Sequence, residues 1–310
     1  MRARIAIVTA AVCLASLLAC GDGTAAPPYR GTLTLARDGA NDPFNPAVIV
    51  DLDLASNKLE VRFDGFDPDR TRTGETAYIT RLAAGAVADY AIVAADARGV
   101  PGPPLYVCKS FSFNLNRICH TPKLSPDGRL VAFGTAAGGG NLCKNDYGTK
   151  WADYVVVRDR KGAEVARFEG YYYPAWLADG RLLMLGSPCR GAGVWVAERA
   201  LGLPARIDGN LVATPAKHPA VSPDGRRVAL VWNNQVWVLT LDGRHELTQL
   251  THADKPVASA AWSPDGSALA VLLWNVTMPV RSLLLVRLGD DRSTVVRELP
   301  FSPFGPMSWR

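Results

Sequence analysis

The sequence predicts an all-β protein, a six-bladed β-propeller whose C-terminal strand completes the N-terminal blade. A similar segment recurs four times, at steps of 52, 45 and 41 residues, close to the length of one four-stranded blade. Alternating apolar residues flank each copy, as expected for strands. The C-terminal residues 304–310 resemble the start of another copy. The copies are HTPKLSPDGRLVAF (120–133), YYPAWLADGRLLML (172–185), HPAVSPDGRRVAL (218–230) and SAAWSPDGSALAV (259–271).

Each copy contains an Asp-Gly pair that predicts a tight turn between the first and second strands of a blade. Proline sets φ before the turn in three copies, the aspartate tolerates the next position, and glycine accepts positive φ. We therefore interpret these pairs as structural, although SPDG resembles a catalytic motif. They are Asp127–Gly128, Asp179–Gly180, Asp224–Gly225 and Asp265–Gly266.

The remaining strands follow in order. Third strands are expected at 153–159, 193–199, 234–243 and 281–288, so the four clear repeats fill residues 120–300. Residues 75–119 are expected to form a second full blade, and residues 31–63 supply only three strands. The blade formed by residues 31–63 therefore lacks an inner strand, and we assign residues 304–310 to that strand. Closing the ring in this way leaves only short outer strand edges exposed.

The N-terminal segment predicts export. Arg2 and Arg4 precede an apolar run from Ile5 to Leu18, which is too short to cross a bilayer as a helix and is typical of a signal peptide. The residues around Cys20 resemble a bacterial lipoprotein signal. That resemblance implies a signal peptide at 1–19, an acylated Cys20 (typically carrying palmitate) and a lipidated tether at 20–30. Gly21 then favours the outer membrane, facing the periplasm. An ordinary secretory signal with an unmodified Cys20 is the alternative.

The repeats resemble the TolB-type, or PD40 (WD40-like), β-propeller repeat of bacterial envelope proteins. The resemblance covers residues 31–310, clearly in four blades and faintly in two. It implies the fold and a cell-envelope location. The α/β domain that precedes the propeller in TolB has no counterpart here, and the lipid anchor takes its place. A role in a Tol–Pal system therefore does not carry over.

Four cysteines remain once Cys13 is removed and Cys20 is acylated, an even number that suggests disulfides in an exported protein. Cys108 and Cys119 fall in one expected hairpin. Cys143 and Cys189 fall in the same type of loop in adjacent blades. We expect the pairs 108–119 and 143–189, with four buried thiols as the alternative.

No reactive motif stands out in the sequence. The 34 Lys and Arg and 29 Asp and Glu are interspersed, which argues against nucleic acid as a partner. His245 and His252 are interpreted as surface residues. The acidic segment 64–69 is interpreted as a solvated turn between blades and not as a calcium loop. Loops at 134–152, 186–193 and 274–281 share one face, where recognition is expected.

Five residues are expected near one mouth of the central channel, because they lie at the starts of inner strands at positions that match within one residue. The simpler interpretation is that these residues form a polar lining of the channel. The alternative is a metal or substrate site with two imidazole ligands. The residues are His120, Thr121, Tyr173, His218 and Ser259.

These features favour a non-enzymatic, lipid-anchored envelope scaffold that binds a protein partner or ligand. We expect a monomer with no cofactor and no metal. The alternative is a propeller enzyme or solute-binding protein that acts on a polysaccharide or small molecule at the channel mouth, with or without a metal.

Overall fold

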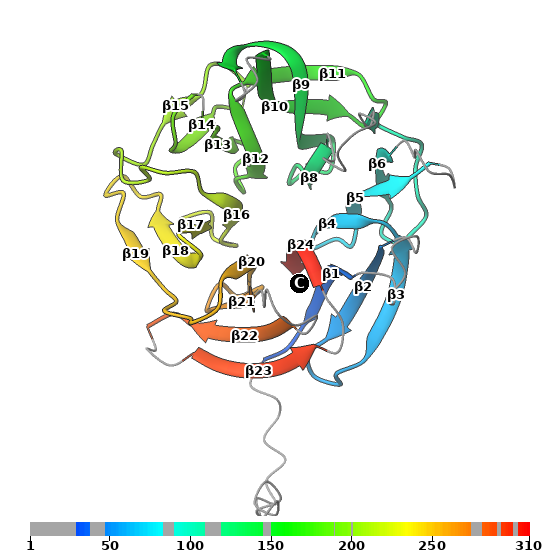
Figure 1. Cartoon of the computed structure of the whole chain (residues 1–310). Helices are drawn as coiled ribbons and strands as arrows, with labels where there is room; N and C mark the ends of the chain where they lie inside the picture. The colour runs from blue at the N-terminus through cyan, green and yellow to red at the C-terminus, as the bar shows by residue number, and fades with distance from the viewer. Residues whose placement is uncertain are drawn as a thin grey trace, which may run out of the picture.

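The computed structural model is a ring of six four-stranded antiparallel sheets around a central channel (Figure 1). It describes residues 29–37, 47–82, 90–108, 119–144, 150–188, 190–199, 201–273, 281–289, 293–299 and 303–310. Every element within those ranges is a strand. No helix long and apolar enough to cross a membrane occurs among them. The all-β six-bladed prediction is confirmed.

The strands of blades 1 to 3 pair in order from the innermost strand outward. Blade 1 consists of β24 (Pro303–Trp309), β1 (Thr32–Arg37), β2 (Val48–Asp53) and β3 (Leu59–Asp64). Blade 2 consists of β4 (Phe66–Arg70), β5 (Thr76–Arg81), β6 (Tyr90–Ala95) and β7 (Tyr106–Cys108). Blade 3 consists of β8 (Cys119–Leu124), β9 (Leu130–Lys144), β10 (Lys150–Asp159) and β11 (Glu164–Glu169).

Blades 4 to 6 follow the same order. Blade 4 consists of β12 (Tyr171–Trp176), β13 (Leu182–Gly186), β14 (Val194–Ala197) and β15 (Ala205–Arg206). Blade 5 consists of β16 (Lys217–Val221), β17 (Arg227–Trp232), β18 (Gln235–Thr240) and β19 (Leu247–Gln249). Blade 6 consists of β20 (Val257–Trp262), β21 (Ala268–Leu273), β22 (Arg281–Arg287) and β23 (Ser293–Leu299).

The ring closes as the sequence predicts. β24 is the inner strand of blade 1 and pairs antiparallel with β1, with Trp309 opposite Leu33. The backbone N–H of Thr32 donates to the carbonyl of Arg310 at 2.8 Å. The indole N–H of Trp309 donates to the carbonyl of Arg30 at 3.0 Å. Both ends of the ring are therefore held in one sheet.

The expected boundaries of blade 2 are wrong. The inner strand of this blade is β4, which falls on the acidic segment expected to be a solvated turn, and Cys119 starts the inner strand of blade 3. The charged residues and Pro68 of β4 are typical of a loop, so the sequence does not predict a strand there. Its Asp67 and Arg70 are nevertheless buried, because neighbouring strands provide their partners.

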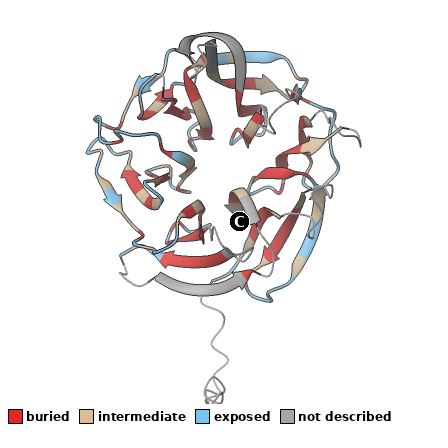
Figure 2. Cartoon of the chain, in the orientation of Figure 1, coloured by how far each residue is buried: buried red, intermediate tan, exposed pale blue. Residues whose placement is uncertain are grey.

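The apolar core lies between neighbouring blades (Figure 2). The second strands are buried on both faces, so they read as continuous apolar runs rather than as alternating ones; Leu182 to Leu185 are all 1% exposed or less. Tryptophans near the ends of inner strands tie blades together. The indole N–H of Trp176 donates to the carbonyl of Lys123 at 3.0 Å, and that of Trp262 to the carbonyl of Ala220 at 2.7 Å.

The two faces of the ring differ in the connections that they carry. The turn face bears the connections between first and second strands and between third and fourth strands; the loop face bears the others. Thr32 pairs with Asp53 at the end of β2, so the chain enters the ring on the turn face. The four Asp-Gly pairs also lie there, with glycine φ values of 68°, 86°, 69° and 71°. In three of these turns a serine hydroxyl donates to the aspartate, from Ser125, Ser222 and Ser263.

Cys108 and Cys119 form a disulfide, with their Cα atoms 5.8 Å apart. It joins the outermost strand of blade 2 to the innermost strand of blade 3, so it links two blades and not the two strands of one hairpin. The predicted 143–189 pair is untested, because Cys189 and the side chain of Cys143 lie outside the described residues. Residues 1–28, with Cys20, also lie outside them.

Candidate functional site at the mouth of the central channel

The inner strands begin with a repeated backbone irregularity. In four blades the residue before a proline has positive φ: 50° at Asp67, 48° at Thr121, 49° at Tyr173 and 47° at His218. The pairing register shifts at each of these positions, as in a β-bulge. Such φ values are strained for residues other than glycine and cluster at functional sites. In β24 the equivalent residue is glycine, Gly305, with φ 73°.

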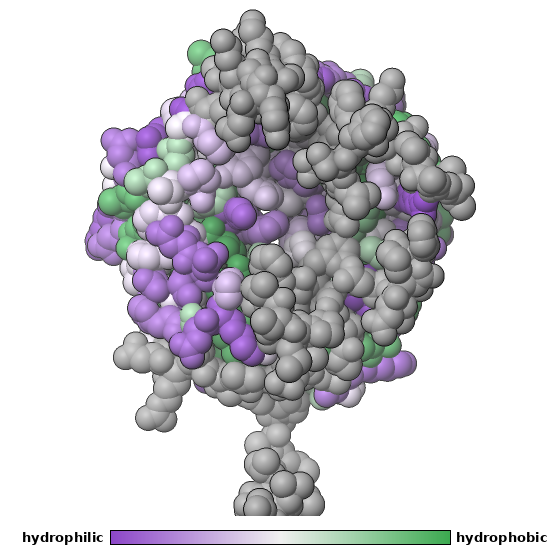
Figure 3. All heavy atoms as spheres, in the orientation of Figure 1, coloured by the Kyte–Doolittle hydropathy of each residue, from purple (hydrophilic) through white to green (hydrophobic). Residues whose placement is uncertain are grey.

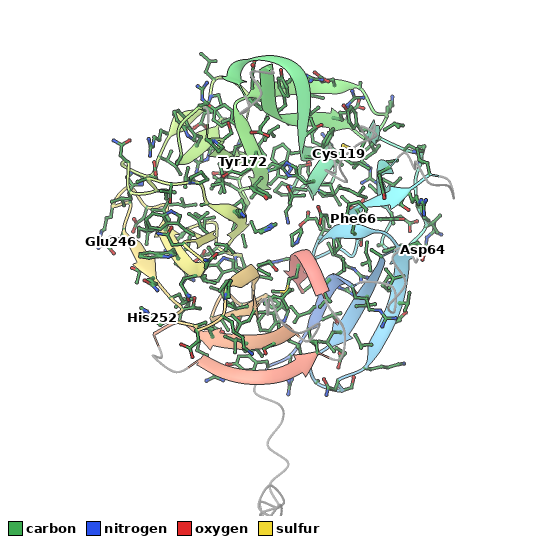
Figure 4. The ribbon with its side chains drawn as sticks, in the orientation of Figure 1. Asp64, Phe66, Cys119, Tyr172, Glu246 and His252 are labelled. Atoms are coloured by element: carbon green, nitrogen blue, oxygen red, sulfur yellow. A yellow bond between two sulfur atoms is a disulfide. The ribbon has the colours of Figure 1, made fainter. Side chains whose placement is uncertain are left out.

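Three of the predicted residues form an aromatic stack on consecutive inner strands. The ring of Tyr173 on β12 lies 4.9 Å, centroid to centroid, from the ring of His120 on β8 and 4.9 Å from that of His218 on β16. Tyr172, labelled in Figure 4 beside the channel, packs against Tyr173 at 4.6 Å and donates its hydroxyl to the carbonyl of Ala216. The side chains of three blades therefore meet at this mouth.

Thr121 and Ser259, the other two predicted residues, are both buried. The backbone N–H of Thr121 donates to the carboxylate of Asp67 at 3.1 Å, and its hydroxyl lies 3.1 Å from Nδ1 of His120. Ser259 is fully buried on β20, and its hydroxyl has no hydrogen-bond partner among the described residues. Ser259 therefore lies on an inner strand but forms no hydrogen bond with the stack.

Sequence reasoning missed the acidic members of the site. Asp67 on β4 supports Thr121, and Asp69 forms an ion pair with Lys123 at 2.9 Å. The available signal was the pair Asp67–Pro68, which matches Tyr173–Pro174 and His218–Pro219. This match is hard to recognise in the sequence, because the turn after β4 lacks the Asp-Gly pair of the other copies.

The stack is electrically neutral at pH 7. Burial lowers the pKa of His120 to about 4 and that of His218 to about 3, the latter also through repulsion from His120, Lys123 and Lys217. Burial, with the nearby charges of Asp67 and Asp153, raises the pKa of Tyr173 to about 12. These groups are suited to hydrogen bonding and stacking. They are poorly matched to proton transfer near pH 7, which favours groups with a pKa near that value.

Tyr173 separates the two histidines at the mouth. Tyr173 lies on the blade between theirs, and its ring contacts both imidazoles. No group of three or more histidine, cysteine, aspartate or glutamate residues in the described part of the chain is arranged to hold a metal. His252, which was expected at the surface, lies at the outer edge of blade 5 with Nδ1 3.2 Å from Nε2 of Gln249 (Figure 4).

Hydrophilic residues lie along part of the rim of the hollow at the centre of the loop face (Figure 3). A narrow cavity below the mouth is lined from several blades, including Thr121, Lys123, His218 and Met307. The loop at 134–152, predicted to contribute to recognition, has described backbone through 144 and from 150 onward, within β9 and β10. Of the loop at 274–281, only Arg281 is described.

Acid should destabilise the fold through His120 and His218. Their folded-state pKa values lie below the ordinary 6.5, so the unfolded chain takes up protons first, and stability falls as pH drops from about 6.5 towards 4. Each histidine should cost on the order of 1–2 kcal/mol at pH 5. Urea unfolding at pH 7.5 and pH 5 measures this loss. The double variant His120→Gln/His218→Gln should lose clearly less; an equal loss would assign the effect to other groups.

No family model matches the sequence, and neither does any curated protein. Solved structures do match. TolB from Acinetobacter baumannii aligns with a TM-score of 0.66 and 15% identity, covering 90% of this chain and 66% of that one, just under two thirds. A protein assigned as TolB from Agrobacterium tumefaciens gives 0.58 and 14%, covering 89% and 91%. Hydrazine synthase from Kuenenia stuttgartiensis gives 0.59 and 13%, covering 89% of this chain but 46% of that one. At these identities the likeness concerns architecture alone, and this chain has a TolB-like six-bladed propeller fold.

Proposed function

We propose that this protein is a lipid-anchored scaffold of the bacterial cell envelope that binds a partner protein at the channel mouth on its loop face, without catalysing a reaction. The observation that carries the proposal is the mouth itself. Strained bulges on several inner strands hold a neutral His120–Tyr173–His218 stack, which offers aromatic and hydrogen-bonding surface. Binding surfaces of proteins are enriched in such aromatic side chains.

The anchor would leave this surface accessible. The chain enters the ring on the turn face, at Tyr29 to Gly31, and the mouth opens on the loop face. A tether of residues 20–30 can span at most about 35–40 Å. An acylated Cys20 would therefore hold the turn face towards the membrane and the loop face away from it. The TolB-like fold supports a protein-binding role and an envelope location only by analogy.

Site-specific cross-linking in intact cells tests the proposal. A photoreactive residue replaces Tyr173 at the mouth or, as the matched control, the exposed Arg226 on the turn face. A partner should be captured from position 173 and not from position 226, and Cys20→Ser should abolish the capture. Equal capture from both positions, or none from 173, would overturn the proposal. Metabolic labelling with a fatty acid tests acylation of Cys20 directly.

A second candidate is a solute-binding or enzymatic role within the channel. The observation in its favour is that Nδ1 of His218 and the hydroxyl of Ser259, on adjacent inner strands, are buried without a hydrogen-bond partner among the described residues. A small polar molecule, such as a sugar, would satisfy both. Thermal-shift screening of saccharides with the wild type and His218→Ala distinguishes the roles: a shift lost in the variant favours the solute, and no shift for any saccharide removes this candidate.

A further inference from the structure

The most exposed large apolar residue among those described is Leu203, which lies on the turn face. Its exposed fraction is 96%, whereas the next highest such residue, Val61, is 58% exposed. The connection that holds it runs from β14 to β15, beside the first turn of blade 4: Arg181 Nη1 lies 4.0 Å from Oε1 of Glu198. Leu201 has φ 54°, a strained value for leucine. Leu203 is therefore an almost fully exposed leucine in a connection that also holds a strained backbone position.

A second apolar residue projects from the same face in blade 2. Val100 is 56% exposed in the turn after β6, and Pro101 beside it is also exposed. This turn lies on the turn face because Ala95, at the end of β6, pairs with Thr76 at the start of β5. Leu203 and Val100 thus project from two separate blades in the same direction.

The chain leaves the ring on this face as well. Tyr29 packs edge-on against Trp309 at 6.2 Å, and the guanidinium of Arg287 lies 5.4 Å from the centre of its ring. This exit lies at blade 1, across the ring from blade 4 (Figure 1). The exit, Val100 and Leu203 are therefore three well-separated points on one face, and three such points define a plane.

Exposed basic side chains occur on this face in all six blades, in turns or at the end of a strand. The shorter aspartates of the Asp-Gly turns are also exposed on this face, and each accepts a hydrogen bond from a backbone N–H of its own turn; they are Asp127, Asp179, Asp224 and Asp265. Arginine and lysine are longer and extend further from the backbone. They are Lys58, Arg98, Arg129, Lys161, Arg199, Arg226, Arg244 and Arg287.

We infer that the turn face lies against an anionic lipid bilayer, with Leu203 inserted among the headgroups, Val100 at the interface and the basic side chains on lipid phosphates. An exposed apolar side chain beside basic side chains that extend from the surface is the combination that interfacial membrane binding uses. The inference deepens the proposed function and rests on it for the approach of this face to a membrane. The bilayer holding the acylated Cys20 is the surface that lies within reach of the tether.

Depth-sensitive fluorescence on vesicles tests the inference without the native lipid anchor. The 24 strands of the six blades lie between Thr32 and Trp309, so a chain starting at Gly21 contains the whole ring. Such a chain, with an N-terminal histidine tag, is held on vesicles by a nickel-chelating lipid. A Cys143→Ser/Cys189→Ser background receives an environment-sensitive fluorophore through Leu203→Cys. The matched control is Leu211→Cys, which is 43% exposed beyond β15 on the loop face.

On vesicles containing phosphatidylglycerol, the fluorophore at 203 should shift to the blue and be quenched by spin-labelled lipid at least threefold more than the one at 211. Equal quenching at the two positions, or none at 203, would overturn the inference. Co-sedimentation of the untagged chain is the second measurement: Leu203→Asp should weaken binding about fivefold or more, and Leu211→Asp should leave it unchanged. Equal effects of the two variants would point to another occupant of this face, such as a protein. Because neither measurement uses Cys20, a failure here is separate from a failure of acylation.

Discussion

A chain that ends at Leu299 should fail to form a stable ring. Deleting residues 300–310 removes β24, the inner strand of blade 1, and leaves β1 with an unpaired edge on the channel side. Met307 and Trp309 are 4% and 8% exposed, and burying side chains of this size contributes about 1.5–3 kcal/mol each. The two together approach the total stability of a marginally stable domain, about 5–15 kcal/mol. We expect an aggregated product, or one without a cooperative urea transition.

A circular permutant separates the loss of the strand from the loss of its position in the chain. In blade 6, six residues separate Trp262 from its partner Leu269. Joining Arg310 to Gly31 through Pro-Asp-Gly would place six residues between Trp309 and its partner Leu33, with new termini between β23 and β24. This permutant should unfold cooperatively with a stability within about 1–2 kcal/mol of the natural order. A truncated chain as stable as the intact one would contradict the closure argument.

The fold could be predicted from the sequence because the residues that specify each repeat lie close together in the chain. Asp-Gly turns and apolar second strands are dictated within about 14 residues, and β24 could be placed because Pro306 to Trp309 resemble the start of a copy. β4 could not be placed in this way. Its Asp67 and Arg70 are buried only because their partners Thr121 and Asp51 lie in other blades, and those contacts exist only after the ring closes.

The candidate site was predictable as a set of positions and not as an arrangement. Offsets from the Asp-Gly turns that match within one residue bring His120, Tyr173 and His218 to one mouth. Blade order then inserts Tyr173 between the two imidazoles, an arrangement that the positions of the two histidines alone did not indicate. Their low pKa values depend on burial by several blades, which no single repeat encodes.

The largest effect of a single substitution is expected at Asp51, where the first two blades meet. This carboxylate on β2 is 6% exposed, accepts the hydroxyl of Thr34 at 2.5 Å and forms an ion pair with the buried Arg70 on β4. Arg310 and Arg62 approach the same oxygen at 3.6 Å and 3.8 Å. One carboxylate thus faces three guanidinium groups, and burial lowers the pKa of Arg70. These partners come from the first two blades and from the C-terminal residue Arg310, so the cluster also helps to close the ring.

Asp51→Asn preserves the shape of the side chain and removes its charge, which leaves Arg70 buried without a counter-ion. Breaking a buried ion pair in this way costs about 3–5 kcal/mol. Glu60→Gln is the matched control, because it removes the exposed Glu60–Arg62 pair of the neighbouring strand and should cost less than about 1 kcal/mol. Urea unfolding of both variants measures the difference. Adding Arg70→Met to Asp51→Asn should restore part of the loss, since the unpaired charge goes with it. A double variant less stable than Asp51→Asn would contradict the argument that the unpaired charge of Arg70 causes the loss, because Arg70→Met keeps the backbone N–H that donates to Ser308.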